Sequence, residues 1–175
     1  LGFWAEPRHR WALAMLRKAR PHLVIANDWP ALVVATAYKT ETGGSVHYDT
    51  HEFATLEFNE QRWWRLVYKP FVSQLERACI HKADTISTVG PHLAKALQEH
   101  YGLITKPDVV RSTPNAIIPP KIIASHWPLR ILYHGYVLPN RGIEELISST
   151  ALWATPHKLT IRGDGDSSYL ALLRQ

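Results

Sequence analysis

The chain has 175 residues, of which 46% are apolar and 20% are charged, and its formal net charge is +5. This balance is typical of a globular protein and excludes intrinsic disorder. No apolar run reaches the roughly 18 residues that a membrane-spanning helix needs. The Lys and Arg residues are scattered, so nothing indicates a nucleic-acid partner.

The cysteine count and the first residues set two further expectations. Cys79 is the only cysteine, which excludes an internal disulfide and a cysteine metal cluster. We expect it to be a buried thiol in a protein of the reducing cytoplasm. The chain starts without an initiator methionine and without the basic start of a signal peptide. We therefore expect it to come from inside a longer protein and to be incomplete at both ends.

Short apolar runs alternate with segments of helical spacing in the first two thirds of the chain. The runs predict strands at residues 22–26, 45–49, 84–88 and 108–111. The helical spacing predicts helices at residues 30–39, 59–82 and 91–101. Pro70 should kink or restart the second helix, and Gly102 should end the third in the left-handed conformation. Alternating strands and helices predict a parallel sheet with both faces covered.

Residues 112–128 then hold four of the twelve prolines and show neither period, which is typical of a linker. The alternation restarts with predicted strands at 130–134 and 158–162, and predicted helices at 140–153 and from 166 onward. We therefore predict an α/β protein with two parallel-sheet domains, both partial. Their predicted bounds are 1–112 for the end of an N-terminal domain, 113–128 for the linker or hinge, and 129–175 for the start of a C-terminal domain.

Polar residues follow two of the N-terminal strands at the edge where open parallel sheets bind ligands. His51 can donate to a sugar hydroxyl or position a leaving group, with Asp49 and Glu52 to orient it. A capped loop with a satisfied histidine fits these residues as well. Asp28, after the first strand, is most simply a helix cap.

A strand that ends in Gly135 leads through a short loop to a helix near Arg141 and Gly142. Gly135 permits a close ligand approach, Asn140 suits a helix cap, and Arg141 with the helix N-terminus suits a phosphate or diphosphate. The glycine spacing matches neither a dinucleotide fingerprint nor a nucleotide-triphosphate loop. An ordinary strand–helix turn with a surface arginine fits equally.

Two further segments each allow two interpretations. Residues 163–165, Gly-Asp-Gly, are predicted to form a tight turn, with Asp164 as a metal ligand in the second interpretation. Residues 61–69 combine Trp63 and Trp64 with Arg and Lys. They predict either a half-buried helix with extended arginines or a helix at a membrane interface.

The ordered motifs resemble the retaining glycosyltransferases of family 4 over residues 20–173, nearly the whole chain. The resemblance is carried by Asn-Asp-Trp at 27–29, Tyr-Asp-Thr-His-Glu-Phe at 48–53, Leu-Glu-Arg-Ala at 75–78, Ala-Asp-Thr-Ile-Ser-Thr at 83–88, Tyr-Gly at 101–102, Ser-Thr-Pro-Asn-Ala at 112–116, Tyr-His-Gly at 133–135, Asn-Arg-Gly at 140–142 and Arg-Gly-Asp-Gly at 162–165. It implies two facing Rossmann-like domains, the GT-B fold. It also implies transfer from a nucleotide-diphospho-sugar to a glycan, lipid-linked or small-molecule acceptor, with retention and without a required metal or other cofactor.

The resemblance also implies roles for single residues. His51 matches the cleft histidine near the transferred sugar, and Gly135 lies in the donor loop. Arg141, followed by Gly142, stands where relatives have a lysine that contacts the donor diphosphate. The acceptor-side candidates are Asp28, Asp49 and Glu52.

The chain departs from the family pattern in three places. Tyr136 stands where many relatives have an arginine, and Asn115-Ala116 stands where Asn-Gly is usual. The family's paired-glutamate motif does not occur in these 175 residues, so we expect the fragment itself to transfer little or no sugar.

Two other functions stay open from the sequence. One is a non-catalytic sugar- or nucleotide-binding protein of the same architecture. The other is a peripheral membrane or partner-binding module that acts through the Trp63-Trp64 helix. The expected location is the cytoplasm, with peripheral contact at the inner membrane face.

Overall fold

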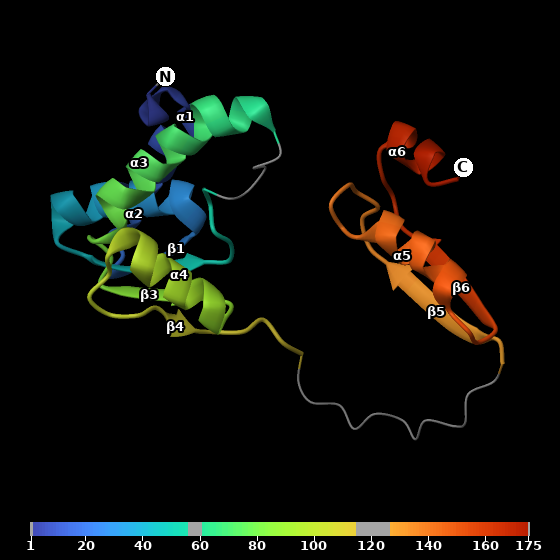
Figure 1. Cartoon of the computed structure of the whole chain (residues 1–175). Coiled ribbons are helices and arrows are strands. Elements are labelled where there is room, and N and C mark those ends of the chain that lie inside the picture. Colours follow the sequence, from blue (N-terminus) through green and yellow to red (C-terminus); the bar gives the residue numbers. More distant parts are fainter. Residues whose placement is uncertain (1, 56–60, 115–126, 175) are drawn as a thin grey trace. The chain divides into compact units, whose positions relative to one another are not determined.

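The computed structural model describes residues 2–55, 61–114 and 127–174. The chain divides into two compact units, Leu1–Pro114 and Asn115–Gln175 (Figure 1). Each unit is an α/β arrangement around a parallel sheet, which confirms the predicted fold class. Most of the predicted linker, residues 115–126, lies outside the described residues, and so do Asn115 and Ala116.

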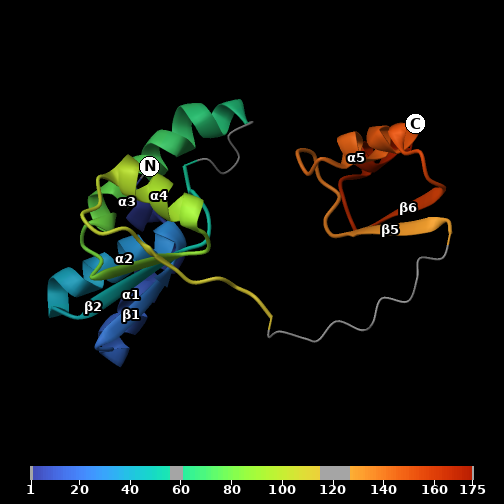
Figure 2. The same ribbon diagram turned by 60° about the horizontal axis from the view of Figure 1, so that its bottom comes forward.

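The sheet of the first unit has four parallel strands in the order β1-β2-β3-β4 (Figure 2). Their bounds are β1 (Leu23–Asn27), β2 (Ser45–Thr50), β3 (Thr85–Thr88) and β4 (Asp108–Val109). The helices of the crossovers are α2 (Asp28–Thr42), α3 (Lys69–Ile80) and α4 (Pro91–Tyr101). These elements confirm the four strands and three helices predicted from the alternation, and Gly102 ends α4 with φ of 67°.

Two N-terminal elements precede the sheet and were not predicted. They are a 3-10 turn, η1 (Phe3–Ala5), and helix α1 (Pro7–Ala19). Pro7 stands in the first turn of α1, where its missing N–H costs no hydrogen bond. Leu13 is the one buried residue of α1. So narrow an apolar stripe leaves only a weak periodic signal in the sequence.

Pro70 restarts the long helix of the first unit, as predicted. A π-helical turn, η2 (Trp64–Tyr68), leads directly into α3, where Pro70 occupies the first turn. The wide turn accommodates the residue that has no N–H to donate.

Only one face of this sheet is covered in the described part of the chain, so the expectation of two covered faces is wrong there. Along β2, Val46, Tyr48 and Thr50 are buried, while the residues between them are exposed or half-buried. On β1, Ile25 is 61% exposed. The helices form one layer, in which α2 packs against both α1 and α3. Successive strands are added in one direction, and right-handed crossovers then place their helices on the same side.

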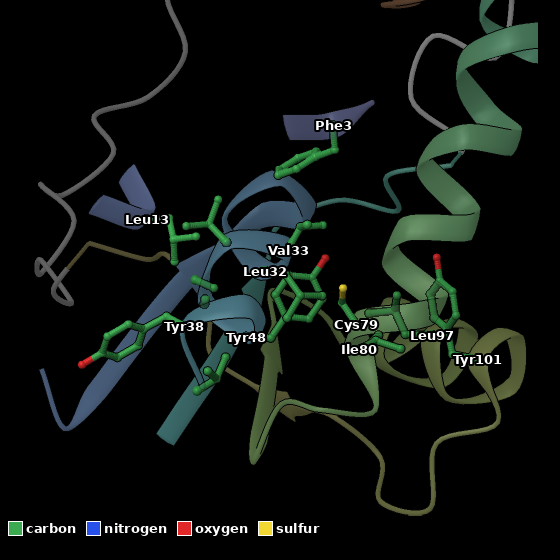
Figure 3. Close-up of a cluster of buried hydrophobic side chains, with 14 of the residues drawn as sticks. Phe3, Leu13, Leu32, Val33, Tyr38, Tyr48, Cys79, Ile80, Leu97 and Tyr101 are labelled. Atoms are coloured by element: carbon green, nitrogen blue, oxygen red, sulfur yellow. The ribbon is translucent and has the colours of Figure 1, made fainter. Parts of the chain in front are cut away.

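The core of the first unit lies between this helical layer and the sheet. Figure 3 shows Leu32 of α2, Tyr48 of β2, and Ile80 and Leu97 of the later helices among its buried side chains. Cys79 belongs to the same cluster and is 8% exposed. The prediction of a buried thiol is therefore confirmed.

A buried carboxyl group lies inside this core and links three of its elements. Glu76 of α3 is fully buried and accepts hydrogen bonds from the hydroxyl groups of Tyr48 at 2.6 Å and Tyr101 at 2.5 Å. Burial raises the pKa of Glu76 and, together with the charge of Glu76, raises the pKa values of both tyrosines. The two O–H donors join β2, α3 and α4 through one polar centre.

The second unit pairs β5 (Leu129–His134) with β6 (His157–Arg162) in parallel. Its helices are α5 (Ile143–Ser149), the 3-10 turn η3 (Thr150–Leu152) and α6 (Ser167–Leu172). Helix α5 starts later than the predicted helix because Asn140 and Gly142 adopt positive φ of 64° and 70°. Gly142, not Asn140, is its N-cap, so the predicted Asn140 cap is wrong.

Residues 163–165 do not form the predicted tight turn. They continue past the end of β6 alongside the loop that follows β5. There Val137 N–H donates to the Asp164 carbonyl at 2.8 Å, and Gly135 N–H donates to the Arg162 carbonyl at 3.1 Å. A Cβ on Gly163 would stand 1.7 Å from the Gly135 carbonyl oxygen. The glycine is therefore needed because two backbones approach each other closely.

We expect Gly163→Ala to separate these two backbones. An overpacked contact of this kind costs about 3 kcal/mol, or roughly a hundredfold in local opening. Amide hydrogen exchange of Val137 should therefore accelerate by about that factor. Gly90→Ala is the matched control, because a Cβ there meets nothing within 4 Å. Unchanged Val137 protection in Gly163→Ala would contradict the close approach.

The raised pKa of Glu76 gives the folding stability a pH dependence of defined sign. The folded state binds this proton more tightly than the unfolded chain does. The wild type should therefore lose stability relative to Glu76→Gln as the pH rises from the ordinary carboxyl pKa through the raised value. Urea unfolding from about pH 3 to about pH 8 measures this difference.

Glu41→Gln supplies a control of opposite sign. A side-chain hydrogen bond from Arg17 lowers the pKa of Glu41 in the folded state. The wild type should therefore gain stability relative to Glu41→Gln as the pH rises from the lowered value to the ordinary one. The account of Glu76 fails if both differences have the same sign.

Candidate functional site

Parallel pairing places the candidate residues of the first unit at the carboxyl edge of the sheet. Asp28 directly follows β1, and His51 directly follows β2. In the register of the sheet, Asp49 of β2 lies between Asn27 of β1 and Ser87 of β3. Paired residues of neighbouring parallel strands point to the same face of the sheet. The side chains of Asn27, Asp49 and Ser87 therefore share the face that the helices leave uncovered.

The ring of His51 lies between two carboxylates. Its Nε2 is 3.2 Å from Asp49 Oδ2, and its Nδ1 is 3.6 Å from Asp28 Oδ1. A neutral imidazole has one N–H, so it can donate to only one of them at a time. The shorter distance favours the tautomer with the proton on Nε2, donated to Asp49.

Polar side chains of β2 and β3 hold Asp49 in place. The Ser87 hydroxyl donates to Asp49 Oδ1 at 2.5 Å, and Ser87 is itself 2% exposed. The ring of His47 joins Ser87 Oγ at 3.0 Å and Thr85 Oγ1 at 2.7 Å. This chain of contacts limits the positions that the Asp49 carboxylate can take, and through it the His51 ring.

Asp28 does not act as the simple helix cap that the sequence predicted. Helix α2 has Asn27 at its N-cap and no side-chain cap bond there. Asp28 adopts a positive φ of 62°, and its Oδ1 accepts from the His51 backbone N–H at 3.4 Å. A non-glycine residue in this conformation is strained, and such strain clusters at functional sites.

Glu52 enters the site through its main chain. Its carbonyl oxygen accepts from the Thr50 hydroxyl at 2.8 Å, while the Thr50 carbonyl accepts from the Thr88 hydroxyl at 2.7 Å. These bonds fix the path of the backbone through His51. The described contacts bring Asp28 and Asp49, but not the Glu52 carboxylate, to the imidazole.

The candidate residues of the second unit lie in the loops after β5. Gly135 follows the last residue of β5, and Arg141 is exposed between Asn140 and Gly142, the two residues with positive φ. Tyr136, next to Gly135, is 71% exposed, and its carbonyl accepts from the Tyr133 hydroxyl at 2.8 Å. The backbone of this loop is therefore held by β5, β6 and residues 163–165, while the Arg141 side chain extends into solvent.

Sequence reasoning missed His47 and Ser87. The available signal was spacing: His47 lies two residues before Asp49, and Thr85 lies two residues before Ser87. Residues two apart on a strand share a face. The register that sets the two pairs side by side could not be read from either strand alone.

The described residues contain neither a candidate metal site nor a membrane-spanning helix. No group of three or more His, Cys, Asp or Glu side chains there is arranged to hold a metal ion, and Asp164 joins no such group. No helix in the same residues has the length and apolar character to cross a membrane.

The fold and the site together indicate a class of protein. A Rossmann-like parallel sheet with a histidine and two carboxylates at its carboxyl edge is an α/β ligand-binding or enzyme domain. Residues 1–116 match the family described as the Glycosyl transferase 4-like domain, and the chain belongs to this family. No curated protein matches the chain. The family resemblance predicted from the ordered motifs is thereby confirmed.

The two carboxylates predict opposite effects on the His51 tautomer. In Asp49→Ala, the remaining carboxylate lies beside Nδ1, so we expect the Nδ1–H form to increase at the expense of Nε2–H. Long-range ¹H–¹⁵N correlation spectra of the neutral ring measure the two forms. Asp28→Ala is the matched control and should keep the Nε2–H form. If Asp49→Ala also keeps it, the positioning role of Asp49 is refuted.

Proposed function

We infer from membership of the family that this chain is part of a glycosyltransferase, which acts on a sugar donor and an acceptor. We propose that the parent protein is a hexosyltransferase that uses a nucleotide-diphospho-sugar and retains the anomeric configuration. The acceptor is a glycan, a lipid-linked molecule or a small molecule. The observation that carries the proposal is the imidazole of His51 between two carboxylates at the carboxyl edge of the sheet.

In this proposal the first unit is the acceptor side, and His51 is its catalytic residue. When His51 donates its Nε2–H to Asp49, Nδ1 is left to accept a hydrogen bond from a sugar hydroxyl. When the proton is on Nδ1 and is donated to Asp28, Nε2 accepts instead. Asp49 sets the ring, and Asp28 adds negative charge beside it. Both carboxylates also stabilise positive charge that develops on the sugar ring during transfer.

The second unit is the proposed donor side. Gly135 has no side chain, so a donor can approach the backbone closely at the start of the loop, and Gly142 allows the tight path into α5. The Arg141 guanidinium is planar and always charged, which suits a diphosphate. As the bond to the sugar breaks, negative charge develops on the diphosphate, and Arg141 stabilises it.

The proposed reaction requires no metal and no other cofactor, because Arg141 supplies the positive charge. We place the protein in the cytoplasm, at the inner face of the membrane when its acceptor is lipid-linked. The net charge of +5 favours contact with anionic partners.

A second candidate is a protein of the same architecture that binds a nucleotide-sugar without transferring it. The observation that favours it is Tyr136, whose exposed side chain carries no positive charge where a second cation would help to neutralise the diphosphate. Donor binding without turnover in the full-length protein would select this candidate.

Arg141→Ala tests the donor side. Loss of charge-assisted hydrogen bonds to a diphosphate weakens binding by about 10–100-fold. Calorimetric titration of the full-length protein with nucleotide-diphospho-sugars, followed by turnover assays, measures affinity and rate. Arg130→Ala is the control, because Arg130 is an exposed arginine near the opposite end of β5. Equal affinities and rates in Arg141→Ala and the wild type would refute the donor-site assignment.

A further inference from the structure

Apolar and basic side chains are exposed together on the helix that leads into α3. Trp63 is 67% exposed and Leu66 is 74% exposed. Arg62 and Arg65 beside them are also exposed. We call these four residues the Trp63–Leu66 patch. These residues fall within five consecutive positions, so the two exposed apolar side chains and the two exposed arginines lie near one another.

The same helix continues directly into α3, which packs against α2 in the first unit. Within the helix the Trp64 ring stacks on Tyr68 with centroids 5.9 Å apart, and Phe71 of α3 meets Trp29 of α2 edge-on at 6.5 Å. Figures 1 and 2 show the helix, coloured teal to green, extending from α3 to the border of the unit. The helix is therefore held through α3, and the side chains of the patch are exposed to solvent.

The charged residues of the described stretch 61–69 are all basic. They are Arg62, Arg65 and Lys69, while Glu57 and Glu60, which precede them in the sequence, lie outside the described residues. Among the contacts of the described residues, neither Arg62 nor Arg65 has an acidic partner. A partner that covers this surface must therefore supply negative charge as well as an apolar layer.

Helix α1 shows that an exposed tryptophan alone does not make such a surface. Trp11 is also 67% exposed, and Met15 is 41% exposed. However, Arg17 of α1 pairs with Glu41 at 2.6 Å, and Arg8 lies 3.9 Å from Glu6. The cations of α1 are thus partly neutralised within the protein.

The chemistry of the patch distinguishes an anionic bilayer from a nucleic acid. Nucleic acids use aromatic rings for stacking and cations for phosphates, and they have no use for an exposed leucine. A lipid interface accepts tryptophan and leucine below the headgroups, while arginines extend to the lipid phosphates. We infer that the Trp63–Leu66 patch docks the first unit onto the surface of an anionic lipid bilayer. This docking is independent of sugar transfer.

Vesicle co-sedimentation of the chain tests the inference. One set of vesicles contains phosphatidylcholine alone, and the other contains equal parts of phosphatidylcholine and phosphatidylglycerol. We expect binding to the anionic vesicles, weakened by salt. Trp63→Ala/Leu66→Ala should weaken it at least about tenfold. Arg62→Gln/Arg65→Gln should weaken it about 25-fold, since each basic residue near the surface contributes about fivefold.

Trp11→Ala/Met15→Ala is the matched control and should bind like the wild type. Circular dichroism of each variant verifies that the unit stays folded. The inference is overturned if the wild type does not bind anionic vesicles, or if the control loses as much binding as Trp63→Ala/Leu66→Ala. Binding to neutral and anionic vesicles alike would overturn the role of the arginines. None of these results depends on nucleotide-sugar binding, so the proposed function is tested separately.

Discussion

The parallel pairing of β2 with both neighbours is the constraint on which the first unit depends. Successive residues of a strand alternate between faces, so one register decides the surroundings of the whole segment. It sends Tyr48 toward the helices, where its hydroxyl reaches Glu76, and it sends His47 and Asp49 to the uncovered face. A shift of one residue would bury the Asp49 carboxylate in an apolar core and remove one of the two hydroxyl donors from Glu76. The core and the site are thus two consequences of one set of backbone hydrogen bonds.

Local rules predicted most of the elements because their signals are local. Short apolar runs indicated the strands, and Pro70 and Gly102 marked a helix restart and a helix end. Where local rules failed, a second backbone was involved. Asn140 is a good capping residue by type, but the loop places Gly142 at the helix start. Gly-Asp-Gly is a good turn sequence, but here the glycines admit the neighbouring loop.

The sequence predicted three residues of the candidate site, His51, Asp49 and Asp28, but not the contacts that join them. His51, Asp49 and Asp28 were candidates because each lies at or just beyond the end of a strand. That His51 lies between the two carboxylates, and that Ser87 holds one of them, depends on β1, β2 and β3 lying side by side. The helix cap predicted for Asp28 is wrong because its unusual φ follows from the surrounding structure and not from residue type.

The sequence by itself determined the α/β class, the family resemblance, the buried Cys79 and the presence of an aromatic-basic helix. These features depend on composition, period and motif order, which are written along the chain. The tertiary structure decided which face of β2 is buried, which carboxylates contact His51, and which tryptophans of residues 61–68 are exposed. These depend on contacts between residues far apart in sequence, such as Asp49 with Ser87 and Tyr101 with Glu76. Only folding brings such residues together, so no local pattern records them.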